Sequence, residues 1–442
     1  MKFRMLCLAA ASLFSLVGSA SAVPSVAPTG VTVYDRAKAY PCDVLFSIDD
    51  ATYLVDKEGA LIKKWPEQGF PSKMVDPKLV SGKKGIIGVQ LSAIEVTNGA
   101  AGTGLVPGLP AGFRNKTFGL VDWNNKPLWT WGENAPGGAA RQHHDWERLE
   151  NGNMLLLTNV GRKIPGFGER AMLDDVIREV DKDGNIVWSW SATDHLNEFG
   201  FTPEELELIK KKAAVDFLHT NDLRVLGPNQ WADAGDSRFA PENILISSRD
   251  ANFTAIIDKK TGHVVWRIGP DYPKASPMSA YTLPKPVDQI SGQHDAYMIP
   301  EGLPGAGDIL MLDNQGEAGY PSVELQVTGG SRVIEINPST KQIVWQYTAS
   351  YSGEPDWRFF TPFMGGAQRL PNGNTLIDEA INGRFFEVTP QGEIVWEYVS
   401  PYKGSAPQPP VPGRPRPMSN LVYRIQAVPL SWVPDKAQAA KE

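Results

Sequence analysis

Short apolar runs separated by polar turns recur along the chain, and six of these patterns share one plan. Each has a run rich in β-branched and aromatic residues, a turn of mostly polar residues, and a second apolar run that carries Trp. A strand, a tight turn and a strand form a β-hairpin. The turn and second strand of the six hairpins span Asp56–Trp65, Asp122–Trp131, Asp181–Trp190, Asp258–Ile268, Asn337–Tyr347 and Thr389–Tyr398. Their spacing of about 50–80 residues predicts six repeated units.

A second strand–turn–strand pattern precedes several of these hairpins. It spans His144–Asn159, His219–Asp250, His294–Asn314 and Gly365–Glu379. Each unit therefore contains four strands, here named A to D, and four-stranded units repeated around an axis make a β-propeller. The sequence predicts an all-β fold, a six-bladed β-propeller of four-stranded blades. A β-sandwich of irregular hairpins is the alternative, although a sandwich does not need the same hairpin six times.

The two ends of the repeat array must meet for the ring to close. The segment Asn420–Trp432 has strand character and follows the sixth unit, so we expect this C-terminal strand to complete the first unit. Residues 30–432 are therefore assigned to the propeller, and the polar residues 433–442 to a disordered tail. One segment has a helical pattern, in which Thr202 is a good N-cap and Glu205 completes a capping box.

The first 22 residues form a candidate signal peptide. Lys2 and Arg4 precede the apolar run Met5–Val17, and residues 20–22 offer the small side chains of a cleavage site. The run is too short to span a membrane, and no later apolar run reaches that length. We therefore expect the mature chain to begin at Val23, not to span a membrane, and to be periplasmic or secreted.

Composition supports the fold and excludes one class of partner. The chain of 442 residues has 42 Gly, 36 Pro and 13 Trp, which supply turns and aromatic packing to a β protein. The net charge is −7, and cleavage would remove Lys2 and Arg4 to leave −9. A negatively charged protein has no electrostatic attraction for nucleic acid, so a nucleic-acid partner is not expected. Cleavage would also remove Cys7 and leave Cys42 as a lone thiol, expected as a small buried residue.

Three of the six histidines open similar segments: His144 in "HHDW", His219 in "HTND" and His294 in "GQHDA". The A strand of each propeller blade lines the central channel, so we expect all three at one register and one mouth of that channel. Strand B returns antiparallel to the same level, which places Arg249 beside His219. Three imidazoles and a guanidinium make an anion site whose groups can act as nucleophile, acid and base.

Other interpretations of this group stay open. Three His ligands with an open position could form a metal site, but the charge of Arg249 beside a metal ion argues against it. We expect no metal and no other cofactor, and the sequence has no P-loop, no G-x-G-x-x-G after a strand and no G-x-S-x-G elbow. His195 lies in a loop and His263 in a hairpin turn, and both are expected at the surface.

Three further residues are candidates for contact with a substrate. Strand alternation turns His143 to the face opposite His144, so one of the two is the channel residue, and we favour His144. Trp146 lies two residues after His144 on the same strand face, whereas the other Trp residues are expected to pack between blades. Asn314 ends a B strand on the same rim.

Over nearly all of the mature chain the sequence resembles the bacterial arylsulfotransferases. The resemblance begins at Gly30–Trp65, ends in "NLVYRIQAVP", and is most specific in "HHDW", "HTND", "ISSRD" and "GQHDA". It implies a six-bladed propeller exported to the periplasm, which moves sulfuryl groups between phenols without 3′-phosphoadenosine phosphosulfate. Some family members carry a β-domain ahead of the propeller and a cysteine pair, and this chain is expected to have neither.

The resemblance also implies roles for individual residues. His294 is the nucleophile that becomes sulfated, His219 and Arg249 bind the sulfuryl oxygens, and a His of "HHDW" lies alongside. A neutral imidazole nitrogen is available near neutral pH, and the paired donors of Arg249 favour charge that develops on the oxygens. The implied partners are a phenolic sulfate donor and a phenol acceptor, and a homo-oligomer is left open.

Three alternatives to this function remain. If water replaces the acceptor phenol, the protein is an aryl sulfatase. If the site captures an anion without turnover, the protein is a binding module. The third is a quinone-dependent dehydrogenase propeller, but the chain has no vicinal cysteines and no second cofactor motif.

Overall fold

The protein is described from a computed structural model of the whole chain. The described residues are 28–49, 51–94, 113–169, 171–212, 215–272, 282–316, 329–405, 413 and 417–435. The predicted signal peptide and most of the predicted tail lie outside them. Among the described residues, no helix is long and apolar enough to cross a membrane.

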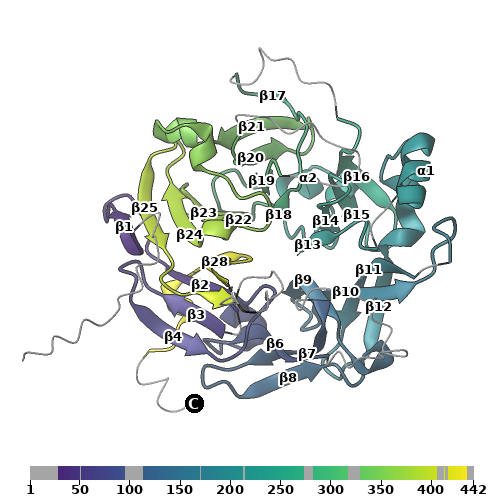
Figure 1. Cartoon of the computed structure of the whole chain (residues 1–442), viewed down its shortest axis with the longest axis horizontal. Helices are drawn as coiled ribbons and strands as arrows, with labels where there is room; N and C mark the ends of the chain where they lie inside the picture. Colours follow the sequence, from purple (N-terminus) through teal and green to yellow (C-terminus); the bar gives the residue numbers. More distant parts are fainter. Residues whose placement is uncertain are drawn as a thin grey trace, which may run out of the picture.

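Six antiparallel sheets stand around a common centre, which is the arrangement of a six-bladed β-propeller (Figure 1). The strands of each blade are named here in order from the central axis outward. Blade one is β28 (Ile425–Val428), β2 (Asp43–Ile48), β3 (Ala51–Val55) and β4 (Leu61–Trp65). Blade two is β5 (Lys73–Met74), β6 (Ile87–Ala93), β7 (Asn115–Val121) and β8 (Pro127–Trp131). Blade three is β9 (Gln142–Arg148), β10 (Met154–Arg162), β11 (Met172–Val180) and β12 (Ile186–Ser191).

The other three blades complete the ring, and two of them carry a fifth strand on the outside. Blade four is β13 (Thr220–Val225), β14 (Ile244–Ser248), β15 (Phe253–Ile257) and β16 (Val264–Ile268). Blade five is β18 (His294–Met298), β19 (Ile309–Asp313), β20 (Arg332–Asn337), β21 (Gln342–Tyr347) and β17 (Lys285–Pro286). Blade six is β22 (Gly366–Arg369), β23 (Thr375–Glu379), β24 (Arg384–Val388), β25 (Ile394–Val399) and β1 (Gly30–Tyr34). The predicted fold class is confirmed.

Both ends of the chain close the ring. The C-terminal strand β28 pairs with β2 and becomes the innermost strand of blade one, as the sequence predicts. The N-terminal strand β1 pairs with β25 and becomes the outermost strand of blade six. A buried ion pair between Lys57 and Glu387, with N and O 2.7 Å apart, also crosses the junction of the first and last blades.

The Trp residues that mark the six hairpins form a second ring. Each indole N–H donates a hydrogen bond to a backbone carbonyl in the C–D turn of the next blade, and the last returns to the first. The pairs are Trp65–Asp122, Trp131–Gly184, Trp190–Gly262, Trp266–Pro338, Trp345–Pro390 and Trp396–Lys57, with N···O distances of 2.8–3.3 Å. The repeated turn and the repeated Trp therefore act together as one inter-blade contact.

Apolar packing follows the same six-fold plan. Each pair of neighbouring blades shares one buried cluster, as between blades three and four, where Leu157 and Ile177 pack with Leu223 and Phe253. Cys42 belongs to the cluster between blades six and one, and burial raises the pKa of its thiol to about 12. It is a small buried residue, as expected.

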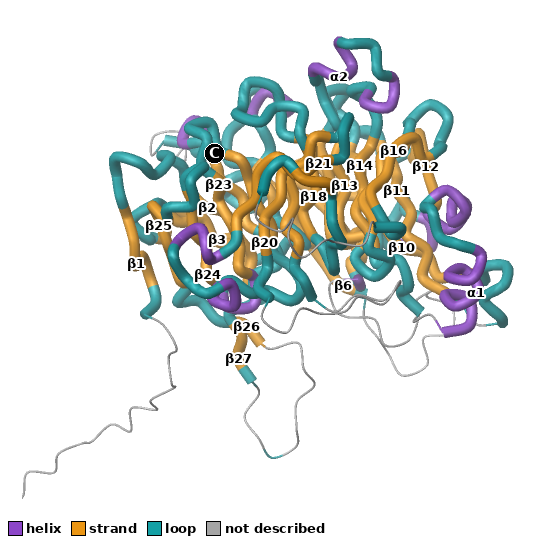
Figure 2. The backbone as a smooth tube through the Cα atoms, turned by 90° about the horizontal axis from the view of Figure 1, so that it is seen from above, coloured by secondary structure: helices purple, strands orange, loops and turns teal. Residues whose placement is uncertain are grey.

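The two α-helices of the described residues lie outside the blades, near opposite faces of the ring (Figure 2). They are α1 (Pro203–Lys212) and α2 (Gln230–Asp233). The capping box is confirmed, because the N–H of Glu205 donates to the Thr202 hydroxyl at 3.1 Å and the N–H of Thr202 donates to the Glu205 carboxylate at 2.8 Å. A separate two-stranded sheet is formed by the short strands β26 (Gly404–Ser405) and β27 (Met418–Ser419), which are not part of a blade.

The other regular segments in the described part of the chain are short 3₁₀ helices, of which Ala192–Glu198 is the longest and is kinked at His195. They are Pro77–Val80, Pro136–Gly138, Ala192–Glu198, Ser237–Phe239, Ala349–Ser352, Asp356–Arg358, Ala380–Asn382 and Leu430–Trp432.

Candidate active site

The predicted histidines meet where the A strands of blades three, four and five begin. The rings of His144 and His219 lie 4.7 Å apart between centroids. The ring of Tyr423, from the segment that enters β28, lies 5.5 Å from His144 and 6.5 Å from His294. The backbone N–H of Arg249 donates to the carbonyl of His219 at 3.1 Å, so Arg249 belongs to the same rim. Four residues predicted from three blades therefore share one site.

The predicted common register of the three histidines is wrong. His294 begins β18, but His144 is the third residue of β9 and His219 lies just before β13. Each of the three A–B strand pairings carries a bulge near its start, which shifts the side chains out of simple alternation. His144 and His219 also adopt left-handed φ values of 53° and 50°, which are rare for residues other than glycine and concentrate at functional sites.

The same bulge overturns the expectation that His143 faces away from His144. The two Nδ1 atoms are 2.8 Å apart, and both side chains are buried. The Nε2 of His143 lies 3.5 Å from a carboxylate oxygen of Asp175, whose second oxygen accepts the N–H of Thr220 at 2.7 Å. Both histidines of "HHDW" therefore belong to the site.

His294 is held as a neutral imidazole with a defined tautomer. Burial, reinforced by the charge of Arg249, keeps its pKa well below the usual value. Its Nδ1 lies 2.8 Å from two acceptors, the Gly292 carbonyl and the Asn314 side-chain oxygen, so Nδ1 carries the proton. Nε2 therefore carries a lone pair, which accepts the backbone N–H of Met364 at 3.2 Å.

Asn314 orients His294 instead of contacting a substrate as predicted. Its side chain is fully buried, and its amide nitrogen donates to the carbonyls of Thr361 and Met364 at 2.7 and 2.8 Å. These two bonds fix the amide so that its oxygen faces Nδ1 of His294. Asn314 is a positioning residue in this arrangement.

His219 differs from the other rim histidines in charge. Although burial opposes its protonation, the Asp216 carboxylate, 2.6 Å from Nδ1, raises the pKa of His219 to about 9. Burial lowers the pKa of His143 to about 4 and, together with the charge of His219, keeps the pKa of His144 well below its usual value. At neutral pH the rim therefore holds one imidazolium, from His219, beside neutral imidazoles.

Aromatic side chains that the sequence did not indicate surround the histidines. Phe113 stacks on His143 at 5.0 Å and contacts the rings of His144 and His219 at 4.9 and 5.8 Å. Phe70 contacts His144 at 4.5 Å. These residues lie outside the A strands, and no sequence motif marks them. They supply apolar surface of the kind that an aromatic ligand can pack against.

The channel behind the histidines is filled by a buried ion network. Arg424 meets the carboxylates of Asp145, Asp222 and Asp295 at 2.9, 3.3 and 3.3 Å, and these acids follow the rim histidines on blades three, four and five. Asp295 therefore serves this network, consistent with the expectation that it does not orient His294. Beyond the network, a cavity of 360 Å³ opens at the other mouth of the channel, lined in part by Arg224.

Trp146 takes no part in the rim. Its side chain is buried in the cluster between blades two and three, and its indole N–H donates to the carbonyl of Pro71 at 2.9 Å. The predicted contact of Trp146 with a substrate is therefore not supported by its position. Like the hairpin Trp residues, it packs between blades.

Several buried polar atoms at the rim have no hydrogen-bond partner among the residues that the structure describes. They are His143 Nε2, Asp175 Oδ1, Thr220 Oγ1 and Asn221 Oδ1. Burial raises the pKa of Asp175 to about 8, and the charge of Asp216 adds to the effect. Unpaired buried polar groups are costly and concentrate where a protein binds polar ligands. The rim thus combines cationic side chains, neutral imidazoles and aromatic walls.

Comparison with known families places the chain in one of them. The family model described as Arylsulfotransferase (ASST) matches residues 130–404, which is more than half of the chain and includes all the predicted site residues. The chain therefore belongs to the arylsulfotransferase family. No curated protein matches it.

Solved structures resemble the chain only at the level of fold. A Bacteroides caccae protein of unknown function is 12% identical, with a TM-score of 0.45, and the match covers 87% of this chain and 98% of that one. A streptogramin B lyase is 12% identical, with a TM-score of 0.38 and coverage of 86% and 85%. The Pseudomonas aeruginosa periplasmic gluconolactonase is 9% identical, with a TM-score of 0.39 and coverage of 81% and 97%.

Proposed function

We propose that the protein is an exported arylsulfotransferase that works through a sulfohistidine on His294 and needs no 3′-phosphoadenosine phosphosulfate. Family membership supports transfer of a sulfuryl group from an aryl sulfate. The observation that carries the covalent step is the neutral His294, whose proton is held on Nδ1 by Gly292 and Asn314, so that Nε2 keeps a lone pair for attack.

In the first half-reaction, Nε2 of His294 attacks the sulfur of an aryl sulfate. The N–S bond forms, the S–O bond to the aryl group breaks, and the phenolate leaves with a proton from the His219 imidazolium. Arg249 donates to the sulfuryl oxygens, which favours the charge that develops during transfer, whereas the one remaining ring N–H of His219 serves the leaving oxygen because its Nδ1 is bonded to Asp216. The attack requires Nε2 to give up its 3.2 Å hydrogen bond from Met364.

In the second half-reaction, an acceptor phenol takes the sulfuryl group. Its oxygen forms the new S–O bond, the N–S bond breaks, and its proton goes to His219, which is neutral after the first step. One residue thus serves as acid and then as base, and the enzyme returns to its starting state. Phe113 and Phe70 are placed to pack against the aromatic rings of donor and acceptor.

A chromogenic aryl sulfate tests the covalent step directly. Without acceptor, wild-type protein should release one phenol per site in a burst and gain the mass of one sulfuryl group on the peptide that contains His294. His294→Ala should show neither. His263→Gln, which changes a histidine far from the rim, is the matched control and should behave like wild type.

The outcomes separate the alternatives. Sulfuryl mass on a peptide with His144 or His219 would contradict the assignment of the nucleophile but keep the chemistry. Continued turnover without a phenol would identify an aryl sulfatase. Binding of the aryl sulfate without release of phenol would identify a non-catalytic module.

We also propose export through cleavage of the predicted signal peptide. The sequence pattern of residues 1–22 supports it. N-terminal sequencing of the protein from the periplasm or medium should begin near Val23. Recovery of the intact N-terminus from the cytoplasm would overturn this proposal.

A further inference from the structure

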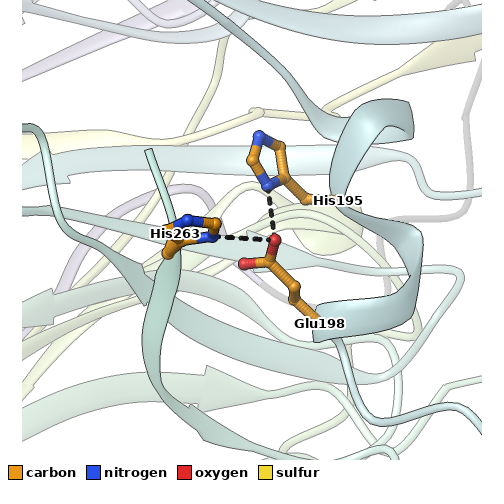
Figure 3. Close-up of side chains that lie close together, drawn as sticks. All are labelled: His195, Glu198 and His263. Atoms are coloured by element: carbon orange, nitrogen blue, oxygen red, sulfur yellow. Dashed lines mark hydrogen bonds and ion pairs between the residues drawn. The ribbon is translucent and has the colours of Figure 1, made fainter. Parts of the chain in front are cut away.

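Two histidines far from the rim meet over one carboxylate on the outer edge of the ring. His195 and Glu198 lie in the 3₁₀ segment Ala192–Glu198, which follows blade three. His263 lies in the C–D turn of blade four, just before β16. The Nδ1 atoms of His195 and His263 lie 2.9 and 3.1 Å from the same oxygen of Glu198 (Figure 3). Residues expected as separate surface histidines thus form one group.

The three side chains offer one potential metal-ligand atom each, all within 4.8 Å of one another, and the part of the chain that the structure describes has no other such group. Ligand atoms on a tetrahedral zinc ion are roughly 3.3 Å apart, given bond lengths near 2.0–2.1 Å. The two observed N···O separations need to widen by only a few tenths of an ångström to admit the ion.

The surroundings hold the three ligands in place. Trp190 stacks on the ring of His195 at 4.9 Å and 14°, and its indole N–H holds the carbonyl of Gly262, next to His263, at 2.8 Å. The second oxygen of Glu198 accepts the N–H of Val264 at 2.8 Å, which leaves the first oxygen for a ligand. Such outer contacts orient metal ligands. One Trp and one backbone N–H therefore pre-position all three.

We propose that His195, Glu198 and His263 bind a zinc ion that joins the segment after blade three to the outer hairpin of blade four. Two imidazoles and one carboxylate suit Zn²⁺, and the 68% exposure of His263 leaves a fourth position open to water. Glu198 supplies the carboxylate oxygen that both imidazoles already reach. The site lies on the outside of the ring and is independent of the sulfuryl chemistry.

Zinc titration of tag-free, metal-stripped mature protein tests this site. Calorimetry with ZnCl₂ should show one equivalent bound, and zinc should raise the Tm. His263→Gln, at the most exposed ligand, should lose the binding and the Tm rise while the metal-free Tm stays that of wild type. Glu198→Gln should weaken zinc binding at least tenfold.

His144→Gln is the control for zinc binding at the rim histidines. It should still bind one equivalent, and His263→Gln should keep wild-type sulfuryl transfer. Loss of zinc binding in His144→Gln but not in His263→Gln would move the metal to the rim and overturn the proposal. No binding by wild-type protein at millimolar zinc would also overturn it and leave the group as a hydrogen-bonded clamp between blades.

Discussion

At the scale of single residues, the site depends on two histidines held in opposite protonation states. Burial and the charge of Arg249 keep His294 neutral, while Gly292 and Asn314 hold its one proton on Nδ1. His219 lies against Asp216, whose charge keeps it protonated. In the proposed mechanism this separation of pKa values makes His219 the acid and His294 the nucleophile.

The pH dependence of the first half-reaction should report His219. Its folded-state pKa is raised, so the required imidazolium is present at neutral pH and is lost as the pH rises through about 9. Burst rates measured with an aryl sulfate should therefore fall above that pH. Asp216→Asn removes the charge that raises the pKa of His219. The fall in burst rate with rising pH should therefore begin at a lower pH in this variant. If the burst rate of Asp216→Asn fell at the same pH as that of wild type, the role of His219 as acid would be contradicted.

Arg249 should be sensitive to a change that preserves its charge. Arg249→Lys keeps a cation but loses the paired donors of the guanidinium, so we expect a loss of about 10²–10³ in kcat/KM. Steady-state kinetics with a phenol acceptor measure it. Arg36→Lys is the control, because Arg36 forms an exposed ion pair with Glu58. Its kcat/KM should be close to that of wild type. Equal kcat/KM values for Arg249→Lys and Arg36→Lys would contradict a role of the Arg249 guanidinium in the reaction.

At the scale of elements, each hairpin carries its own link to the next blade. The strand pair provides the Trp, and the turn of the neighbouring hairpin provides the carbonyl that its N–H reaches. The repeated sequence pattern therefore encodes both halves of one contact. This explains why the same turn-and-Trp pattern recurs six times in a chain whose A strands differ widely in length.

The strength of these links should depend on burial. Trp131→Phe leaves the buried carbonyl of Gly184 unpaired and removes buried apolar surface, so we expect a loss of about 1–3 kcal/mol in the free energy of unfolding. Trp345→Phe removes an exposed hydrogen bond to the carbonyl of Pro390, so it should lower the free energy of unfolding by less than Trp131→Phe does. Urea unfolding of both variants measures the difference. Equal losses would show that the hydrogen bond to the turn contributes little.

At the scale of the whole molecule, the ring closes at a junction that both chain ends cross. β28 gives blade one its innermost strand, and the segment that enters it carries Tyr423 and Arg424 into the channel. β1 adds only an outer strand to blade six. Closure and the floor of the site therefore depend on the same C-terminal segment.

Removal of residues 420–442 should abolish both folding and activity. The truncated protein loses the inner strand of blade one and the cation that neutralises Asp145, Asp222 and Asp295, so its thermal transition should lose cooperativity. A synthetic peptide of residues 417–435 should restore a transition and sulfuryl transfer. Removal of residues 28–34 is the control and should lower the Tm without loss of cooperativity. A cooperative, native-like transition in the C-terminal truncation would contradict closure by β28.

Much of the fold followed from local rules, and the site followed in part. Alternation and turn composition act over a few residues, which is why the hairpins, the capping box at Thr202 and the closing strand could be predicted. His219 and Arg249 could be placed on one rim for the same reason, because strand B returns to the level of strand A. The register of the histidines could not, because a bulge depends on pairing with a neighbouring strand.

The amino-acid sequence by itself determined the all-β class, the six blades, the closure of the ring and the histidines and arginine at the centre of the site. Tertiary structure alone decided that Asn314 orients His294, that Asp216 charges His219, and that Arg424 fills the channel. It also brought His195 to His263. The physical reason is range: hairpins form between residues close in sequence, whereas charge, tautomer and ligand geometry are set by contacts between blades.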